Sequence, residues 1–236
     1  MRSISGYRLA LGLLQGGALS LLYYAYEQRI WPATDGEVFA PLLMVALFVP
    51  LIVIQPLRML RLSTLVGHKV PMIRPKASVE YDFEGELMAV IGKEARHVSE
   101  ADAMNYVAGY TLFNDGSLRD FQRRTTDQGK NFYRSSSVGP ELVTLDEIPP
   151  AKEMKLISRL NGKVEQETCI ADMIFPVPVL LSYFSGISRL RPGDMIATGT
   201  CGRVSYSDKA FMKAGDTIEI EITGIGKLVN PIVDEK

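Results

Sequence analysis

The sequence has little of several residue types, and each scarcity excludes a class of protein. Two cysteines, Cys169 and Cys201, are too few for a disulfide framework, and neither has the neighbour that a Cys-x-x-Cys motif needs. The formal net charge of −1 gives no basic surface of the kind that binds nucleic acid. Two histidines, His68 and His97, leave few groups for acid–base chemistry. We therefore expect no nucleic-acid partner.

Charge is absent from two long stretches near the N-terminus. Residues 9–26 and 38–57 carry no charged side chain, and each approaches the roughly 20 apolar residues that span a bilayer. Arginines flank the pair on both outer sides, whereas the linker between them is mostly acidic, which places both ends in the cytoplasm. A buried helical hairpin in a soluble core is the alternative, but neither stretch has a polar stripe. We predict that residues 1–57 form an apolar helical hairpin of two membrane-spanning segments.

The rest of the chain, residues 58–236, has the pattern of short strands separated by turns. Asn161-Gly162 is a strong type I′ hairpin signal, and it predicts antiparallel strands over 154–160 and 163–169. Apolar runs and polar–apolar alternation predict further strands at 108–113, 195–198, 217–223 and 224–233. We therefore expect a second domain, strand-dominated and of the α+β class, at the cytoplasmic face of the inner membrane.

Two helices are expected within this second domain. Residues 176–186 are amphipathic, with proline near the first turn and glycine at the end, which is typical of a helix. Ser99 to Asp102 has the spacing of a capping box and predicts a helix through about Tyr106. Strands thus outnumber helices in the expected fold.

Two acidic residues stand together at the start of an apolar strand. Glu84 and Glu86 flank Gly85, so the alternation of strand side chains places both carboxylates on one face, about 7 Å apart. Such carboxylates repel each other and are costly to bury. A hard divalent cation would cancel the repulsion, with a further oxygen ligand from the charged turn that begins at Asn114. A solvated acidic face without a metal is the simpler alternative.

Eight segments resemble, in order and at suitable spacings, the fumarylacetoacetate hydrolase family. They are FEGELMAVIGK, VAGYTLFNDGSLRDFQ, GKNF, VGPELVTLDEIP, the hairpin around Asn161-Gly162, DMIF, RPGDMIATGT and KAGDTIEIEITGIGKLVNPIV. The resemblance runs from about Met59 to Val233 and implies a mixed β-sandwich roll, a Mg²⁺ or Mn²⁺ site and a homodimer. It also implies a small-molecule substrate. The family cleaves, decarboxylates or isomerises 2-oxo and 1,3-dicarbonyl acids, as in aromatic catabolism.

The resemblance assigns roles to individual residues. The metal carboxylates of the family fall on Glu84, Glu86 and Asp115. The catalytic and substrate-contacting residues fall on Arg119, Gln122 and Lys130, and further substrate contacts fall on Thr198, Gly199 and Thr200. The metal would polarise the oxygens of a chelated 2-oxo acid as a Lewis acid. The two basic side chains would neutralise substrate carboxylates or a developing oxyanion, and the glutamine would orient substrate or water.

The chain departs from the family upstream of the metal strand. The family usually places a lid there, with a His and Glu pair for proton transfer, whereas this sequence has the apolar double segment. His68 and His97 lie outside any lid motif, so we expect His68 to be structural and His97 to be exposed. Decarboxylation or tautomerisation would survive loss of a water-activating pair better than hydrolysis. The alternative is a chain without turnover that serves as a metal- or ligand-binding, membrane-tethered module.

Overall fold

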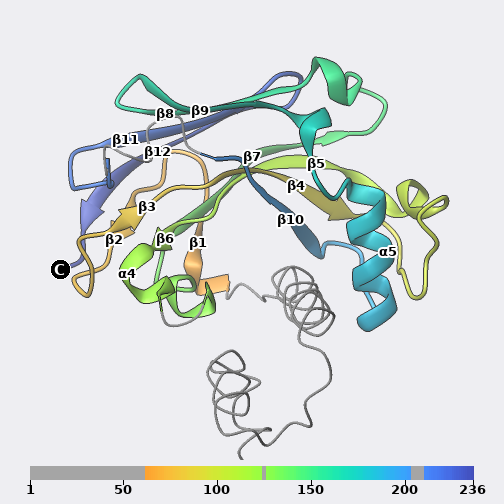
Figure 1. Cartoon of the computed structure of the whole chain (residues 1–236), viewed down its shortest axis with the longest axis horizontal. Coiled ribbons are helices and arrows are strands. Elements are labelled where there is room, and N and C mark those ends of the chain that lie inside the picture. The colour runs from red at the N-terminus through yellow and green to blue at the C-terminus, as the bar shows by residue number, and fades with distance from the viewer. Residues whose placement is uncertain (1–61, 124–125, 203–209) are drawn as a thin grey trace, which may run out of the picture. The chain divides into compact units, whose positions relative to one another are not determined.

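The computed structural model describes residues 62–123, 126–202 and 210–236, which form two layers of β-sheet (Figure 1). One five-stranded sheet has the order β1-β7-β5-β4-β10, and the other has the order β2-β12-β11-β8-β9. The predicted spans, 9–26 and 38–57, lie outside these described residues. Within the described part, no helix has the length and hydrophobicity that crossing a bilayer requires.

Most strand pairs in both sheets are antiparallel. The first sheet contains β1 (Leu65–Val66), β4 (Gly85–Ile91), β5 (Val107–Asn114), β7 (Ser136–Thr144) and β10 (Met195–Thr200). The second contains β2 (Met72–Arg74), β8 (Lys155–Leu160), β9 (Lys163–Cys169), β11 (Thr217–Ile222) and β12 (Gly226–Asp234). Strands β3 (Tyr81–Asp82) and β6 (Ser117–Leu118) form a separate ribbon. Parallel pairing of β1 with β7 and of β12 with β2 makes both sheets mixed, which confirms the strand-dominated class.

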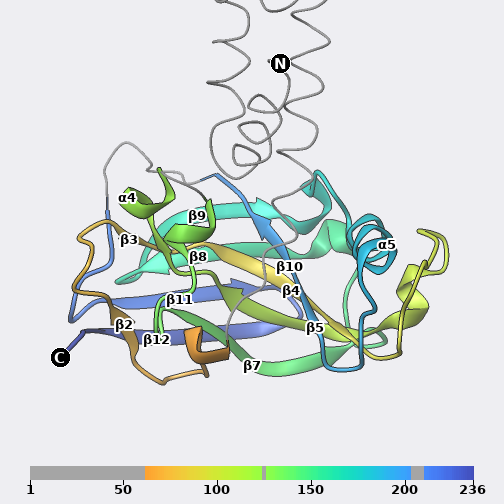
Figure 2. The same ribbon diagram turned by 90° about the horizontal axis from the view of Figure 1, so that it is seen from below.

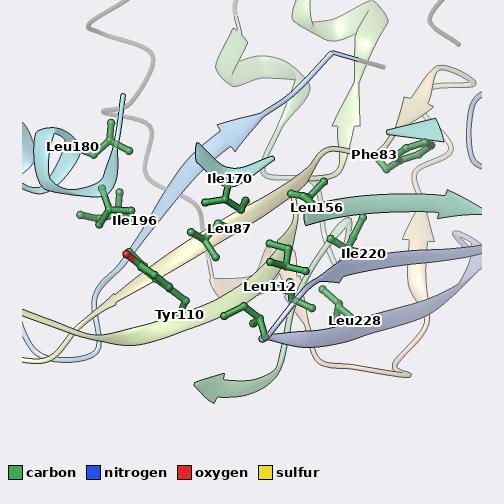
Figure 3. Packing of buried hydrophobic residues seen from close by; sticks show 14 of the residues in the cluster. Phe83, Leu87, Tyr110, Leu112, Leu156, Ile170, Leu180, Ile196, Ile220 and Leu228 are labelled. Carbon is green, nitrogen blue, oxygen red and sulfur yellow. The ribbon is translucent and has the colours of Figure 1, made fainter. Parts of the chain in front are cut away.

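The hydrophobic core lies between the two sheets. Figure 3 shows Leu87 and Leu112 of the first sheet close to Leu156, Ile220 and Leu228 of the second. All five side chains are buried, and removal of their apolar surface from water drives the packing of the layers. Polar and apolar residues alternate strictly in β11, because only the face that carries its isoleucines points into the core.

In the described part of the chain, two short α-helices flank the sheets on opposite sides (Figures 1 and 2). Helix α5 (Val177–Ile187) confirms the helix expected at 176–186 and buries Leu180 and Leu181. Helix α4 (Arg119–Gln122) is a single turn that follows β6.

The helix expected from Ser99 through Tyr106 is wrong over most of its length. The Asp102 backbone N–H donates to Ser99 Oγ, at 3.2 Å, as the capping pattern predicts. The chain then forms only a 3-10 turn, Ala103–Tyr106, because β5 begins at Val107 and pairs with β4. Other 3-10 turns lie at Leu62–Thr64, Thr126–Gly129, Ala151–Glu153 and Ile170–Asp172.

The hairpin of β8 and β9 forms as predicted and contains an irregularity beyond its turn. Asn161 and Gly162 have φ angles of 53° and 82°, which the type I′ turn requires. Arg159 pairs with Val164, yet Ser158 pairs with Gln166, so β9 contains one extra residue. This β-bulge turns Gln166 toward the inner face of the sheet.

We predict that Leu112→Ala lowers the free energy of unfolding by about 2–5 kcal/mol, because the side chain is fully buried between the sheets. Urea unfolding of the full chain measures the loss. Leu142→Ala is the matched control, since this β7 leucine is 49% exposed and its truncation should cost less than about 0.5 kcal/mol. Equal losses in the two variants would contradict this placement of the core.

Candidate metal centre

Three carboxylates meet where β4 begins and β5 ends. Glu84 directly precedes β4, Glu86 lies within it, and Asp115 directly follows β5. The antiparallel register pairs Gly85 with Asn114, and the Asp115 backbone N–H donates to the Glu84 carbonyl oxygen at 2.9 Å. One carboxylate oxygen from each acid lies within 4.8 Å of the others. The structure therefore brings the three predicted metal ligands together.

Gly85 stands between the two glutamates because the second sheet leaves no room for a side chain there. A Cβ atom at this position would lie 2.3 Å from Ser158 Oγ, 3.2 Å from Ile220 Cδ1 and 3.3 Å from Gln166 Oε1. Side chains of the second sheet therefore pack directly against the backbone of β4 at this residue, which only glycine permits. The glutamates consequently lie at the junction of both layers.

Lys130 supplies one of two cations beside the cluster. Its Nζ lies 2.6 Å from Glu84 Oε2 and 2.9 Å from Asp115 Oδ2. The residue follows the 3-10 turn Thr126–Gly129 and is only 3% exposed. A buried ammonium needs such partners, because an unpaired charge in the interior is costly.

Arg119 supplies the second cation and joins the cluster to Gln122. Its Nε contacts Asp82 Oδ2 at 2.7 Å, and its Nη1 contacts Glu84 Oε1 at 2.7 Å. Nη1 also donates to Gln122 Oε1 at 2.8 Å. The planar guanidinium thus holds two carboxylates and an amide in one arrangement.

Asp82 is a site residue that was not predicted from the sequence. It is buried at 1% exposure and orients Arg119, although it is not one of the three clustered carboxylates. Strand alternation, which places Glu84 and Glu86 on one face, extends back to position 82, so the sequence contains the same signal for this residue.

The environments of the two glutamates shift their pKa values in opposite directions. Burial acts to raise the pKa of Glu84, but the ion pairs with Lys130 and Arg119 outweigh it and lower that pKa. Burial, followed by the charges of Asp115 and Glu84, raises the pKa of Glu86 to about 8. The ion pairs therefore favour the charged form of Glu84, whereas the charged form of Glu86 is disfavoured in the metal-free centre.

The donor set fits a hard divalent cation. Three carboxylates converge with Asp82 beside them, and the positive charges paired to these four acids come from Arg119 and Lys130. Oxygen ligands without histidine or cysteine suit Mg²⁺ or Mn²⁺ rather than zinc. A divalent cation would supply the charge that the excess of acids demands.

The predicted substrate-contacting residues Thr198, Gly199 and Thr200 form an irregular turn at the end of β10, which lies beside the cluster and is bonded to β4. Thr198 Oγ1 donates to the Leu87 carbonyl at 2.8 Å, and the Gly199 N–H donates to Glu86 Oε2 at 2.9 Å. Thr200 Oγ1 donates to the Gly85 carbonyl at 3.0 Å. The turn is a bulge in the pairing of β10 with β4, and Gly199 has a φ of 89° that favours glycine.

A cleft of about 510 Å³ opens next to the turn and to Arg119. Its lining consists of Glu80, Asp82, Arg119, Gln122, Arg123, Gln166, Thr200, Cys201, Gly202 and Phe211. Three of the predicted substrate-contacting residues, Arg119, Gln122 and Thr200, therefore line one cavity, whereas Lys130 is buried and paired to the carboxylates. Burial raises the pKa of the Cys201 thiol at the cleft wall.

Both histidines lie outside this cleft. His68 Nδ1 accepts a hydrogen bond from the Val229 N–H at 3.1 Å, which is a structural contact with β12. His97 is exposed, and its backbone N–H donates to the Ser185 carbonyl near α5. The cleft lining in the described part of the chain thus has acids, arginines and amides but no imidazole.

Two mixed β-sheets with a buried acidic centre of this kind define a strand-rich protein suited to divalent-metal chemistry. The chain belongs to the fumarylacetoacetate hydrolase family: a family model described as "Fumarylacetoacetate (FAA) hydrolase C-terminal" matches residues 50–233. This match confirms the resemblance found in the sequence.

Named relatives extend the comparison. The chain is 41% identical over 185 residues to the homoprotocatechuate catabolism bifunctional isomerase/decarboxylase of Escherichia coli, which covers 74% of this chain and 40% of that protein. It is 38% identical over 176 residues to the mitochondrial oxaloacetate tautomerase Fahd2a of Rattus norvegicus, with 72% and 56% covered. The chain therefore spans between two fifths and about three fifths of the curated relatives' lengths.

Solved structures agree on the fold. A 5-carboxymethyl-2-hydroxymuconate delta-isomerase from Mycobacterium smegmatis superposes with a TM-score of 0.67 at 32% identity, covering 74% of this chain and 67% of that chain. A fumarylacetoacetate hydrolase from Exiguobacterium antarcticum gives a TM-score of 0.69 at 32% identity, with 73% and 64% covered. The two-layer architecture is thus that of the family.

We predict that Glu86→Gln abolishes divalent-cation binding. Loss of residues that merely support a metal ligand costs about 10- to 100-fold in affinity, so loss of the ligand itself should cost more. Titration calorimetry of the full chain with Mn²⁺ measures the change. Glu167→Gln, an exposed position on β9, is the control and should bind as the wild type does. Wild-type affinity in Glu86→Gln would exclude this residue as a ligand.

The pH dependence of folding stability should also change in Glu86→Gln. In metal-free wild-type protein, the raised pKa of Glu86 means that the folded state binds more protons than the unfolded state between its usual pKa and about 8. Stability should therefore fall as pH rises from about 5 to 8, and Glu86→Gln should remove part of this slope. Urea unfolding in EDTA at pH 6 and 8 measures it, and identical slopes would contradict the burial of an unneutralised carboxyl.

Asp82→Asn tests the support of Arg119. We expect a loss of about 1–3 kcal/mol in unfolding free energy, because a buried hydrogen-bonded ion pair loses one charge. Glu94→Gln, which breaks the exposed pair with Arg189, should cost less than about 1 kcal/mol. If both substitutions had the same small effect, Asp82 would not hold Arg119 in place.

Proposed function

We propose that this chain is a Mg²⁺- or Mn²⁺-dependent enzyme that isomerises or decarboxylates 2-oxo acids. The observation that carries the proposal is the buried cluster of Glu84, Glu86 and Asp115, with Lys130 and Arg119 paired to it. The names of the relatives, an isomerase/decarboxylase and an oxaloacetate tautomerase, support the same reaction classes.

Glu84, Glu86 and Asp115 would hold the metal, which supplies Lewis-acid stabilisation of the enolate oxygens when it is bound. Arg119 and Lys130 would place positive charge next to the same oxygens. Both basic side chains are already fixed by ion pairs, so they need little reorganisation when charge develops.

Gln122 would orient the substrate through its amide nitrogen. Its Oε1 accepts from Arg119 Nη1 at 2.8 Å, and this bond sets which way the amide faces. The Nε2 hydrogens are then directed away from Arg119, and the residue lines the cleft. Thr200 lines the same cleft beside the cluster, while Thr198 and Gly199 would shape the turn that carries it.

The composition of the cleft favours isomerisation or decarboxylation over hydrolysis. Hydrolysis needs a base that activates water, and imidazole is the usual group. Both histidines of the chain lie elsewhere in the fold. In decarboxylation, the C–C bond electrons pass into the enolate as CO₂ leaves, and a proton then restores the ketone, so no activated water is required.

We expect the full chain with Mg²⁺ to accelerate tautomerisation or decarboxylation of oxaloacetate, and EDTA to abolish the activity. Asp115→Asn should lower the rate by at least about 100-fold, because it removes a metal ligand, whereas Glu167→Gln should retain it. Ultraviolet absorbance of the enol and coupled detection of pyruvate measure the two reactions separately. Turnover of acylpyruvates with oxaloacetate left untouched would overturn the preferred reaction class, and no turnover of either would favour a binding module.

We also propose that residues 1–57 form a separate hairpin that tethers the catalytic domain, residues 58–236, to the membrane, and that this domain forms a homodimer. The two uncharged stretches motivate the tether, and family resemblance motivates the dimer. The full chain should float with phospholipid vesicles in a density gradient and resist extraction by high salt. Light scattering in detergent should give twice the chain mass. Release from vesicles by salt alone would contradict membrane insertion.

A further inference from the structure

Gln166 on β9 makes four hydrogen bonds. One is to its neighbour β8, and the others are to β4, to β10 and to Cys201 directly after β10. Its Oε1 accepts from the Gly85 N–H at 3.0 Å and from Ser158 Oγ at 2.7 Å. Its Nε2 donates to Thr200 Oγ1 at 2.8 Å and to the Cys201 carbonyl at 3.0 Å. The residue is fully buried and forms part of the cleft wall. One amide therefore contacts the backbone between the two metal-ligand candidates and also the turn next to them.

The β-bulge in β9 is what places this amide there. The inward-facing partner of Ser158 is Gln166, whereas an uninterrupted register from the hairpin turn would put Glu165 opposite Ser158. A carboxylate at that point could still accept from the Gly85 N–H, but it would have no hydrogen to donate to Thr200 Oγ1 or to the Cys201 carbonyl. The extra residue thus places an amide rather than an acid against Gly85.

The bonds form a closed circuit around the turn. Thr200 Oγ1 accepts from Gln166 and passes its own single hydrogen to the Gly85 carbonyl. Gly85 in turn donates its N–H to Gln166. Both hydrogens of the Gln166 amide are used on Thr200 and Cys201, so the amide has none to give to a substrate without breaking the circuit.

We propose that Gln166 is a positioning residue that sets the Thr198–Cys201 turn against β4 and thereby shapes the cleft for the oxygen-bearing end of the substrate. The proposal rests on the proposed function for its consequence, and on the hydrogen-bond circuit for its geometry. The competing explanation is a structural residue that only holds the two sheets together. The circuit includes Thr200 and Cys201, both of which line the cleft. The two explanations therefore differ in which variants should lose ligand binding.

The test compares Gln166→Glu with Ser158→Ala in the full chain. The glutamate can still accept from Gly85 but has lost the amide hydrogens that hold Thr200 and Cys201. The alanine removes one bond to the same side chain and leaves the turn contacts intact. Oxalate, a planar mimic of the 2-oxo acid enolate, is the probe for ligand binding, and Mn²⁺ is the probe for the metal centre.

We expect Gln166→Glu to weaken oxalate binding to the Mn²⁺-loaded protein by about 10- to 100-fold, while Mn²⁺ affinity stays within about threefold of wild type. Ser158→Ala should lower the thermal midpoint yet keep oxalate affinity within about twofold. Equal weakening of oxalate in the two variants would overturn the proposal in favour of a structural role. Parallel loss of Mn²⁺ and oxalate in Gln166→Glu would also overturn it, because Gln166 would then act through the metal strand.

A second measurement needs neither metal nor oxalate. Amide hydrogen exchange of a peptide that contains residues 198–202 should rise by about tenfold or more in Gln166→Glu and stay at the wild-type level in Ser158→Ala. Thr200→Val should reproduce the rise, and Thr200→Ser, which keeps the hydroxyl, should not. These Thr200 variants decide the proposal even if Gln166→Glu fails to fold, since Thr200 lies on the surface.

Failure of this inference is distinguishable from failure of the proposed function. Wild-type protein that binds neither Mn²⁺ nor oxalate would overturn the function, while the exchange comparison would still decide whether Gln166 holds the turn. Unchanged exchange in both Gln166→Glu and Thr200→Val would overturn the positioning role, whatever the enzyme activity.

Discussion

Neutralisation of buried negative charge is the constraint on which the rest of this structure depends. Glu84, Glu86 and Asp115 crowd into one place, and desolvation makes each charge there expensive. Lys130 and Arg119 compensate Glu84, whose pKa is lowered, but Glu86 keeps a raised pKa of about 8. A centre that takes up either a proton or a metal cation follows from that imbalance.

The close approach of the two sheets is the second constraint. Gly85 has no side chain because Ser158 and Gln166 of the second sheet occupy the space where its Cβ would be. The same close contact between the sheets therefore buries the carboxylates and supports the neighbouring turn. Both sheets contribute to the cleft wall, the first through Thr200 of β10 and the second through Gln166 of β9.

Local sequence signals predicted the elements whose conformation is local. The hairpin at Asn161-Gly162 and helix α5 formed where expected, because turn residues and helix ends act over a few positions. The helix expected from Ser99 did not extend, since pairing of β5 with β4 competes for the same backbone groups. Recognition of the family came from eight segments in order, and it assigned Asp115 and Lys130, which no periodicity could have joined to Glu84.

By itself, the sequence determined the strand alternation, the hairpin turn, the placement of Glu84 with Glu86 and the family. Only the tertiary structure decided that Asp82 orients Arg119, and that a bulge presents Gln166 rather than Glu165 to Gly85. The physical reason is distance along the chain: Gly85 and Gln166 are 81 residues apart, and Thr198 bonds to Leu87 across 111 residues. A single extra residue in one strand reverses which side chains face inward, and only the packed sheets select that register.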